Sequence, residues 1–294
     1  MKKQRGLEAF EAYYSNIYSH RWPQLKESLL DVDKKIAFKN FEAEAVNNEV
    51  LQGNELFGNC FELHKRREIP KDSQGIPLWY EMDLASVIAA KSLGVTPGDD
   101  VLDMCAAPGG KSLVIWDQMN GRGRLVSNEM SENRRSRLKS VLRSYIPREK
   151  REQVFLWGKD GQKIGIKFPH EFEKVLVDAP CSGEKHLLET KSELDQWTPS
   201  RTKKLASRQY SLLCSALLTV KPGGVITYST CSISPLENDG VIERILKKKP
   251  DQIESVSDSN SIPDFVEKTE FGYQIMPDQS GGFGPIFWSV LRRI

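Results

Sequence analysis

The sequence has no run of about 18 apolar residues, the length that a membrane-spanning helix requires. Residues 1–5 are basic, but the apolar core that would complete a secretory signal does not follow them. Glu8 and Glu11 are acidic, whereas mitochondrial transit peptides are poor in acidic residues. A hydrophobic content of 39% suits an ordinary globular core. We therefore expect a globular protein of the cytoplasm.

Cysteine is sparse, and its spacing argues against two common roles. The cysteines are odd in number and widely separated, and no C-x-x-C pair is present to begin a zinc site. We therefore expect reduced thiols and no bound metal. The five residues are Cys60, Cys105, Cys181, Cys214 and Cys231.

Neither sign of charge is in large excess, since 42 basic residues oppose 40 acidic ones and leave a net charge of +2. This balance neither requires nor excludes a polyanionic partner, so the distribution of charge matters more than the total. Basic residues gather in four segments, each of which fits a solvated helix face better than a nucleic-acid contact when taken alone. These are residues 64–67, 134–143, 201–208 and 247–249.

The first 75 residues differ in pattern from the rest. Between residues 6 and 39, apolar and aromatic side chains recur every three or four positions and Pro23 interrupts them, which predicts two or three short helices. Residues 49–69 resemble an irregular β segment, and residues 72–75 are typical of a turn. We therefore divide the chain into an N-terminal element, residues 1–75, and a main domain, residues 76–294.

In the main domain, strand patterns alternate with helix patterns, which is typical of a mostly parallel sheet doubly wound with helices. Residues 273–276 and 285–291 look like strands that pair antiparallel at one edge. The other strands are expected near residues 100–104, 124–128, 153–156, 174–178 and 224–228, and the helices near 83–93, 110–119, 131–145, 200–219 and 235–247.

The first buried strand runs into a loop of small residues and then a helix, the position where doubly wound sheets bind ligands. Small residues let the backbone approach a ligand, and free N–H groups at a helix N-terminus favour a carboxylate. The loop is not G-x-G-x-x-G, and Met104 stands where a triphosphate-binding loop requires its first glycine. The predicted cofactor loop consists of Cys105, Ala106, Ala107, Pro108, Gly109, Gly110 and Lys111.

Three charged residues beyond this loop are further candidates. Glu129 follows the second strand, where an acidic side chain can accept hydrogen bonds from ribose hydroxyls. Asp160 follows the third strand and either meets an adenine amine or is an ordinary turn residue. Arg134 either orients the loop or caps a helix.

Two cysteines stand at strand ends. Cys181 follows the fourth strand in Asp178-Ala179-Pro180-Cys181, and Cys231 follows the fifth. Adjacent parallel strands point their carboxyl ends into one cleft, so both thiols and Asp178 should meet beside the cofactor. Free cysteine is more often a small buried apolar residue, which is our interpretation of Cys60 and Cys214.

Three motifs in order resemble those of the Sun (Nol/Nop/Sun, Fmu-type) family of RNA cytosine-5 methyltransferases, and the similarity runs from about Trp79 to the C-terminus. The resemblance implies an α/β, Rossmann-like class I methyltransferase that uses S-adenosylmethionine. It would have a doubly wound, mostly parallel seven-stranded sheet and a small helical N-terminal element that could position RNA. The motifs are Asp103-Met104-Cys105-Ala106-Ala107-Pro108-Gly109-Gly110-Lys111, Asp178-Ala179-Pro180-Cys181 and Ser229-Thr230-Cys231-Ser232.

The resemblance also assigns roles. Cys231 would be the attacking nucleophile and Cys181 the residue needed for product release, while the loop with Glu129, Arg134, Asp160 and Asp178 would form the cofactor and base site. A thiol suits this chemistry because carbon 5 of cytosine is a poor nucleophile until a thiolate adds at carbon 6. A thiol with a pKa of about 8.5 needs nearby positive potential to ionise. Asp178 could hold the N3 edge of the base.

Finer similarity points to the short mitochondrial ribosomal-RNA branch of the family, although Glu129 replaces the more usual Asp. It favours ribosomal over transfer RNA as substrate, and target selection would depend on basic surface, the N-terminal helices or a protein partner. We expect a monomer. The residues are Met82-Asp83-Leu84-Ala85-Ser86, Ser144-Tyr145-Ile146-Pro147, His186 and Phe283-Gly284-Pro285.

Two alternatives remain open. One is an RNA-binding ribosome-assembly factor with secondary or no methyltransferase activity, which would not need two thiols at strand ends. The other is a methyltransferase for DNA or protein. DNA enzymes use the cysteine of the Pro-Cys motif as nucleophile, so Cys231 favours RNA. The target cytosine would be single-stranded or flipped out.

Overall fold

The computed structural model describes residues 5–31, 34–44, 55–63, 68–258 and 262–294. The basic segment at residues 64–67, and part of the irregular β segment expected before it, lie outside the described residues. No helix in the described part of the chain is long and apolar enough to cross a membrane.

A parallel sheet forms the centre of the main domain. Its strands are β5 (Asp100–Asp103), β6 (Arg124–Asn128), β7 (Val154–Trp157), β8 (Phe172–Asp178) and β9 (Val220–Thr230), in the spatial order β7-β6-β5-β8-β9. Strand β5 lies between β6 and β8, so the chain passes from β5 to β6 and β7 on one side and then returns past β5 to β8 and β9 on the other. The doubly wound arrangement expected from the sequence is confirmed.

Antiparallel strands extend this sheet beyond β9. Strand β13 (Ile286–Arg293) pairs with β9, and both β12 (Tyr273–Ile275) and β10 (Ile253–Val256) pair with different parts of β13. Strand β11 (Glu267–Lys268) pairs with β12 at the edge. The described residues thus form nine strands in this sheet, so the expectation of seven is corrected. The two additional strands are β10, which pairs with the same strand, β13, as β12 does, and β11, which extends the edge beyond β12.

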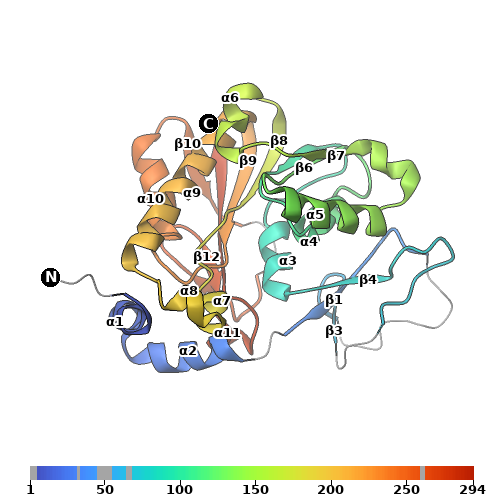
Figure 1. Cartoon of the computed structure of the whole chain (residues 1–294). Coiled ribbons are helices and arrows are strands. Elements are labelled where there is room, and N and C mark those ends of the chain that lie inside the picture. The colour runs from blue at the N-terminus through green and yellow to red at the C-terminus, as the bar shows by residue number, and fades with distance from the viewer. Residues whose placement is uncertain (1–4, 32–33, 45–54, 64–67, 259–261) are drawn as a thin grey trace.

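Helices cover both faces of the sheet (Figure 1). On one face lie α3 (Leu84–Lys91), α4 (Gly110–Gln118) and α5 (Glu132–Tyr145), and on the other lie α9 (Pro199–Thr219) and α10 (Asp239–Lys248). Short helices occur between them: η2 (Arg148–Gln153), η3 (Gly161–Lys163), α6 (Ile164–Lys167), α7 (Glu184–Glu189), α8 (Lys191–Leu194) and α11 (Pro277–Ser280).

The N-terminal residues form two helices and a small sheet. Helices α1 (Leu7–Tyr18) and α2 (Trp22–Leu30) flank η1 (Ser19–Arg21), as the helical pattern predicts. The small sheet has the order β2-β3-β1-β4, with β1 (Ile36–Lys39), β2 (Glu55–Phe57), β3 (Cys60–Glu62) and β4 (Trp79–Met82). Strand β4 lies beyond residue 75 and pairs with β1, so this sheet contains residues from both sides of the expected boundary. The division of the chain into two domains at residue 75 stays a prediction.

Candidate active site

The candidate site lies where the parallel strands end. Asp178 at the end of β8 is in register with Ser229 of β9, and the cofactor loop leaves β5 beside them. Asp103 is fully buried under this loop and accepts a hydrogen bond from Ser112 (2.7 Å). Burial raises the pKa of Asp103 to about 7. The topology therefore brings the three sequence motifs together.

The cofactor loop passes between neighbouring elements so closely that two glycines are required. Gly109 has a φ of +121°, and a Cβ there would lie 3.0 Å from Val141 of α5. A Cβ on Gly110 would lie 2.9 Å from the ring of Tyr80 in β4. The amide of Ala106 donates to Asn128 O (2.8 Å), which ties the loop to the end of β6. The loop is thus held with its backbone close to the site, as a tightly bound cofactor needs.

Glu129 and Arg134 meet beside this loop. Arg134 Nη2 donates to the carbonyl of Ala107 (2.9 Å), and Arg134 Nη1 lies 3.2 Å from Glu129 Oε2. Glu129 Oε1 accepts from Ser131 N (2.8 Å), whereas Oε2 is buried and accepts no hydrogen bond from the described residues. A buried carboxylate oxygen with spare acceptor capacity fits a ribose hydroxyl. Of the two roles considered for Arg134, these contacts correspond to orienting the loop.

Asp160 occupies a turn at the end of β7. Its Oδ1 accepts from Gln162 N (3.1 Å), which is the contact of a turn residue, and Lys163 Nζ lies 3.9 Å from Oδ2. A third of its side chain is exposed. Its contact with an adenine amine stays a prediction.

Lys111, the last residue of the loop, binds Asp178. The distance from Lys111 Nζ to Asp178 Oδ2 is 2.9 Å, and Ser229 donates to Asp178 Oδ1 (2.8 Å). Burial acts to lower the pKa of Lys111, but the adjacent Asp178 carboxylate outweighs it and the net change is a rise. The lysine therefore stays charged and supplies positive potential at the strand ends.

The two strand-end cysteines are in direct contact. Cys181 Sγ and Cys231 Sγ lie 2.8 Å apart as free thiols, with Cys231 exposed and Cys181 half-buried. The hydrogen bond to Cys231, together with burial, raises the pKa of Cys181 well above its ordinary value. Cys181 therefore keeps its proton and can donate it to the sulfur of Cys231. Cys60 is buried and Cys214 lies in α9, so neither belongs to this site.

A cavity of about 340 Å³ opens in front of Cys231. Ser86 of α3, Lys185 and His186 of α7, and Pro285 before β13 also line it. Gly284, in the same lining, is held by its N–H, which donates to Asp83 Oδ2 (3.0 Å). The cavity gives a small planar molecule access to the exposed thiol.

Two buried glutamates behind the cysteines have no counterpart among the sequence predictions. Ser182, next to Cys181, donates its hydroxyl hydrogen toward the carboxylates of both Glu184 and Glu237. Glu184 also accepts from Ile233 N (3.1 Å), two residues beyond Cys231. Burial and the neighbouring Glu184 raise the pKa of Glu237 to about 7. Glu184 and Glu237 thus link the two cysteine loops. The sequence does not predict this role, because a single glutamate after a motif has no distinctive pattern.

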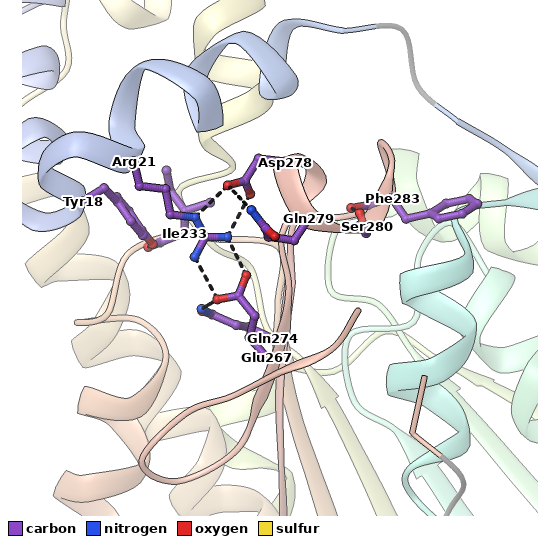
Figure 2. Close-up of polar contacts among 9 residues, drawn as sticks. All are labelled: Tyr18, Arg21, Ile233, Glu267, Gln274, Asp278, Gln279, Ser280 and Phe283. Atoms are coloured by element: carbon purple, nitrogen blue, oxygen red, sulfur yellow. Dashed lines mark hydrogen bonds and ion pairs between the residues drawn. The ribbon is translucent and has the colours of Figure 1, made fainter. Parts of the chain in front are cut away.

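The N-terminal helices contact the same loops. Tyr14 donates to Glu184 (2.5 Å), and Tyr18 donates to the carbonyl of Ile233. Figure 2 shows Arg21 between two carboxylates, with Nε 2.7 Å from Asp278 and Nη1 2.8 Å from Glu267. These residues lie on the buried side of a helical segment that the sequence identifies only by its apolar spacing.

Comparison with known proteins identifies the family of this chain. A family model described as 16S rRNA methyltransferase RsmB/F matches residues 90–292. The 5-cytosine rRNA methyltransferase NSUN4 of Mus musculus is 30% identical over 98% of this chain and 88% of its own length. The mitochondrial tRNA (cytosine(34)-C(5))-methyltransferase of Danio rerio is 37% identical, over 74% of this chain and 61% of its own length. A methyltransferase homologue from Pyrococcus horikoshii, 24% identical, shares the fold with a TM-score of 0.75, over 97% of this chain and 94% of its own.

The expectation of a cytoplasmic protein is wrong. It is contradicted by relatives that are mitochondrial enzymes by name, from Danio rerio at 37% identity and from Mus musculus at 32%. The acidic residues that suggested it belong to the folded helix α1. Glu11 accepts from Trp22 Nε1 (2.7 Å) and pairs with Lys26 (2.5 Å), so it serves the fold and carries no information about targeting.

The family match spans most of the chain and includes all three motifs, and the named relatives methylate carbon 5 of cytosine in RNA. The family, enzyme class and cofactor expected from the sequence are therefore confirmed: the chain belongs to the RsmB/F family and is an S-adenosylmethionine-dependent RNA cytosine-5 methyltransferase.

Proposed function

We propose that this enzyme methylates ribosomal RNA through a covalent intermediate between Cys231 and the target cytosine. The observation that carries the proposal is the contact between Cys181 Sγ and Cys231 Sγ, 2.8 Å apart at the ends of two adjacent strands. Only the outer thiol, Cys231, is exposed to the cavity that a base could enter. The inner thiol, Cys181, is the one whose proton is retained.

The first half of the reaction uses Cys231. Its thiolate attacks carbon 6 and forms an S–C bond, while the electrons of the C5=C6 bond move onto carbon 5 and make it nucleophilic. The Cys181 thiol, donating to Cys231, favours the thiolate before attack. S-adenosylmethionine would supply the electrophilic methyl group that carbon 5 takes up, and it would depart as S-adenosylhomocysteine with the electrons of the broken S–CH3 bond on its sulfur.

The second half uses Cys181. Solvent water, acting as the base, takes the carbon 5 proton, the electrons of the C–H bond restore the C5=C6 bond, and the C6–S bond breaks to release Cys231 as thiolate. Cys181 assists this step, because its sulfur lies within contact distance of the leaving sulfur. The ion pair with Lys111 (2.9 Å) holds the Asp178 carboxylate at the end of β8, where it would bind the polar edge of the base.

Residues on this chain also fit the cofactor. Glu129 offers the ribose its buried Oε2, which accepts no hydrogen bond from the described residues, Gly109 and Gly110 let the loop backbone approach, and Arg134 holds the loop in place. We infer ribosomal rather than transfer RNA as the substrate. The mouse relative that aligns with 98% of this chain is named as an rRNA enzyme, whereas the relative named for tRNA aligns with 74%.

The test is incorporation of labelled methyl groups from S-adenosylmethionine into total RNA from a strain that lacks the gene. We expect 5-methylcytosine in ribosomal RNA with the wild-type enzyme, no label with Cys231→Ala, and a gel-shifted protein–RNA adduct with Cys181→Ala. Cys214→Ala is the matched control, since it removes a thiol from α9 and should change neither readout.

Three outcomes would contradict the proposal. Activity that survives Cys231→Ala would refute the assignment of Cys231 as nucleophile. Label confined to transfer RNA would refute ribosomal RNA as the substrate. Cofactor binding without any label in RNA would favour an assembly factor with secondary or no activity.

A further inference from the structure

Two adjoining cavities lie along the C-terminal half of α5. The first, of about 420 Å³, is lined by residues of α5, η2 and β7, and the second, of about 370 Å³, by the end of α5 and residues 69–77 before β4. Arg143 and Arg151 line both cavities, so the two adjoin, and we name them together the α5 groove. Figure 1 shows α5 and β4 on the same side of the molecule.

The α5 groove is lined by positive charge without compensation. Among the described residues, no acidic side chain lines either cavity, and none of the groove cations forms an ion pair. By contrast, neighbouring Lys150 pairs with Glu42 (2.6 Å). Arg151 is held by hydrogen bonds to the carbonyls of Ile146 (2.8 Å) and Arg143 (2.5 Å). The groove cations are Lys71, Lys139, Arg143, Arg148 and Arg151.

This distribution divides one basic cluster of the sequence into two parts. Arg134 and Arg135, near the start of α5, hold the carbonyls of the cofactor loop and of Glu129. Lys139 and Arg143, one and two turns later, face the α5 groove instead. In another basic cluster, Arg201 is paired with Glu193 (3.1 Å). The α5 groove therefore combines unpaired cations with a concave surface.

The floor of the groove is apolar. Leu142, Ile146 and Val154 line the first cavity, and Ile76 and Pro77 line the second. An apolar floor with cations around it suits single-stranded RNA, whose base and sugar faces need apolar contact while its phosphates need positive charge. A free anion such as phosphate would use the cations but not the floor.

We propose that the α5 groove binds a single-stranded segment of the RNA substrate through its phosphodiester backbone, apart from the cavity that receives the target base. The proposal rests on the function proposed above, because the ligand is that enzyme's RNA. The groove would hold the strand while the cytosine reaches Cys231. Loss of groove cations should therefore weaken RNA binding and leave the chemical step intact.

The test compares two double variants that each remove two exposed positive charges. Arg143→Gln/Arg148→Gln changes the groove, and Lys203→Gln/Lys204→Gln in α9 is the control for net charge. The Kd of a short fluorescein-labelled single-stranded RNA is measured by anisotropy over a series of salt concentrations. Methylation kinetics with the RNA substrate and the Kd of S-adenosylmethionine are measured in parallel.

We expect the groove variant to raise the RNA Kd and KM roughly tenfold, with kcat and the cofactor Kd unchanged. The slope of log K against log salt should fall in magnitude by about 1.4, because each phosphate contact of a single strand contributes about 0.7. The control should change the Kd less than twofold. Wild-type Kd and slope in the groove variant, or an equal effect in the control, would overturn the proposal.

Two further results separate the hypotheses. Normal RNA affinity in the groove variant would refute RNA as the ligand of the α5 groove and would favour an acidic protein segment in its place. A wild-type enzyme that forms no 5-methylcytosine, together with the expected groove effect on Kd, would refute the proposed function alone, because anisotropy does not depend on catalysis.

Discussion

Replacing Arg21 by Gln should destabilise the enzyme and disturb the segment that closes the base cavity. Arg21 joins η1 to β11 through Glu267 and to α11 through Asp278. The Asp278 side chain is completely buried, and Arg21 is the cation that neutralises it. From Asp278 the chain continues to Gly284 and Pro285, which line the cavity beside Cys231.

The expected loss of stability follows from these exposures. Removing one partner of a buried ion pair costs roughly 3–5 kcal/mol, because the other charge stays buried and unpaired. Arg21 is 24% exposed and Glu267 28%, so water partly reaches the site and the lower value applies. A loss of about 3 kcal/mol corresponds to a Tm lower by roughly 6–12 °C, on the scale of large domains.

Arg124→Gln is the matched control. Arg124 also bridges two carboxylates, Asp100 (3.0 Å) and Glu171 (2.8 Å), but it lies at the start of β6, away from the strand ends that form the site. Its partners are 34% and 33% exposed, so its removal should cost about 1 kcal/mol or less. A difference between the variants therefore reports the buried Asp278 rather than the number of ion pairs.

The assay combines thermal unfolding with methylation kinetics. We expect Arg21→Gln to lower Tm more than Arg124→Gln and to lower kcat/KM for RNA, while the Kd of S-adenosylmethionine is unchanged because the cofactor loop is not attached to Arg21. Arg21→Lys, which can reach one carboxylate, should recover part of the loss. The reasoning fails if Arg21→Gln and Arg124→Gln unfold at the same temperature or if RNA turnover is unaffected.

Three further results are expected. Gly109→Ala should weaken binding of S-adenosylmethionine at least tenfold in calorimetry, because its Cβ would contact α5; Gly223→Ala, also at positive φ (+75°) but with open space around it, should not. Burial raises the pKa of Glu237 from 4.5 to about 7, so the folded state holds a proton that the unfolded chain releases between these values. Wild-type Tm should therefore fall as pH rises through this window, and Glu237→Gln should flatten the fall. Tyr14→Phe removes the donor to buried Glu184 and should cost about 1.5–3 kcal/mol in chemical denaturation.

The central sheet and the cysteine pair were predictable because local patterns and one topological rule suffice. Each parallel strand is a short apolar run followed by turn residues, and the carboxyl ends of such strands meet at one edge. That rule brings Cys181 and Cys231 together although 50 residues separate them. The minor strands were not predictable, since β11 has only two residues, Glu267 and Lys268, and carries no apolar alternation.

Contacts between distant side chains could not be read from the sequence. Tyr14 and Glu184 are 170 residues apart, and Arg21 and Asp278 are 257 apart. A hydroxyl or guanidinium on the inner side of a helix shows that a polar partner is needed, but nothing in the spacing identifies the partner. The start of α10 was misplaced for a related reason. Residues 235–238 form turns, and their Glu237 is directed to Ser182 rather than into a first helical turn.

The N-terminal helices illustrate how much such contacts change the interpretation. Phe10, Tyr14 and Leu25 are fully buried in one apolar cluster with Leu187 and Ile233. Leu187 follows Cys181 by six residues and Ile233 follows Cys231 by two, so the helices pack directly beneath both cysteine loops. A division of the chain by sequence pattern assigns these helices to a separate element. Their packing instead couples their stability to the position of the two thiols, so a change in α1 should affect the chemical step before it affects binding of the cofactor.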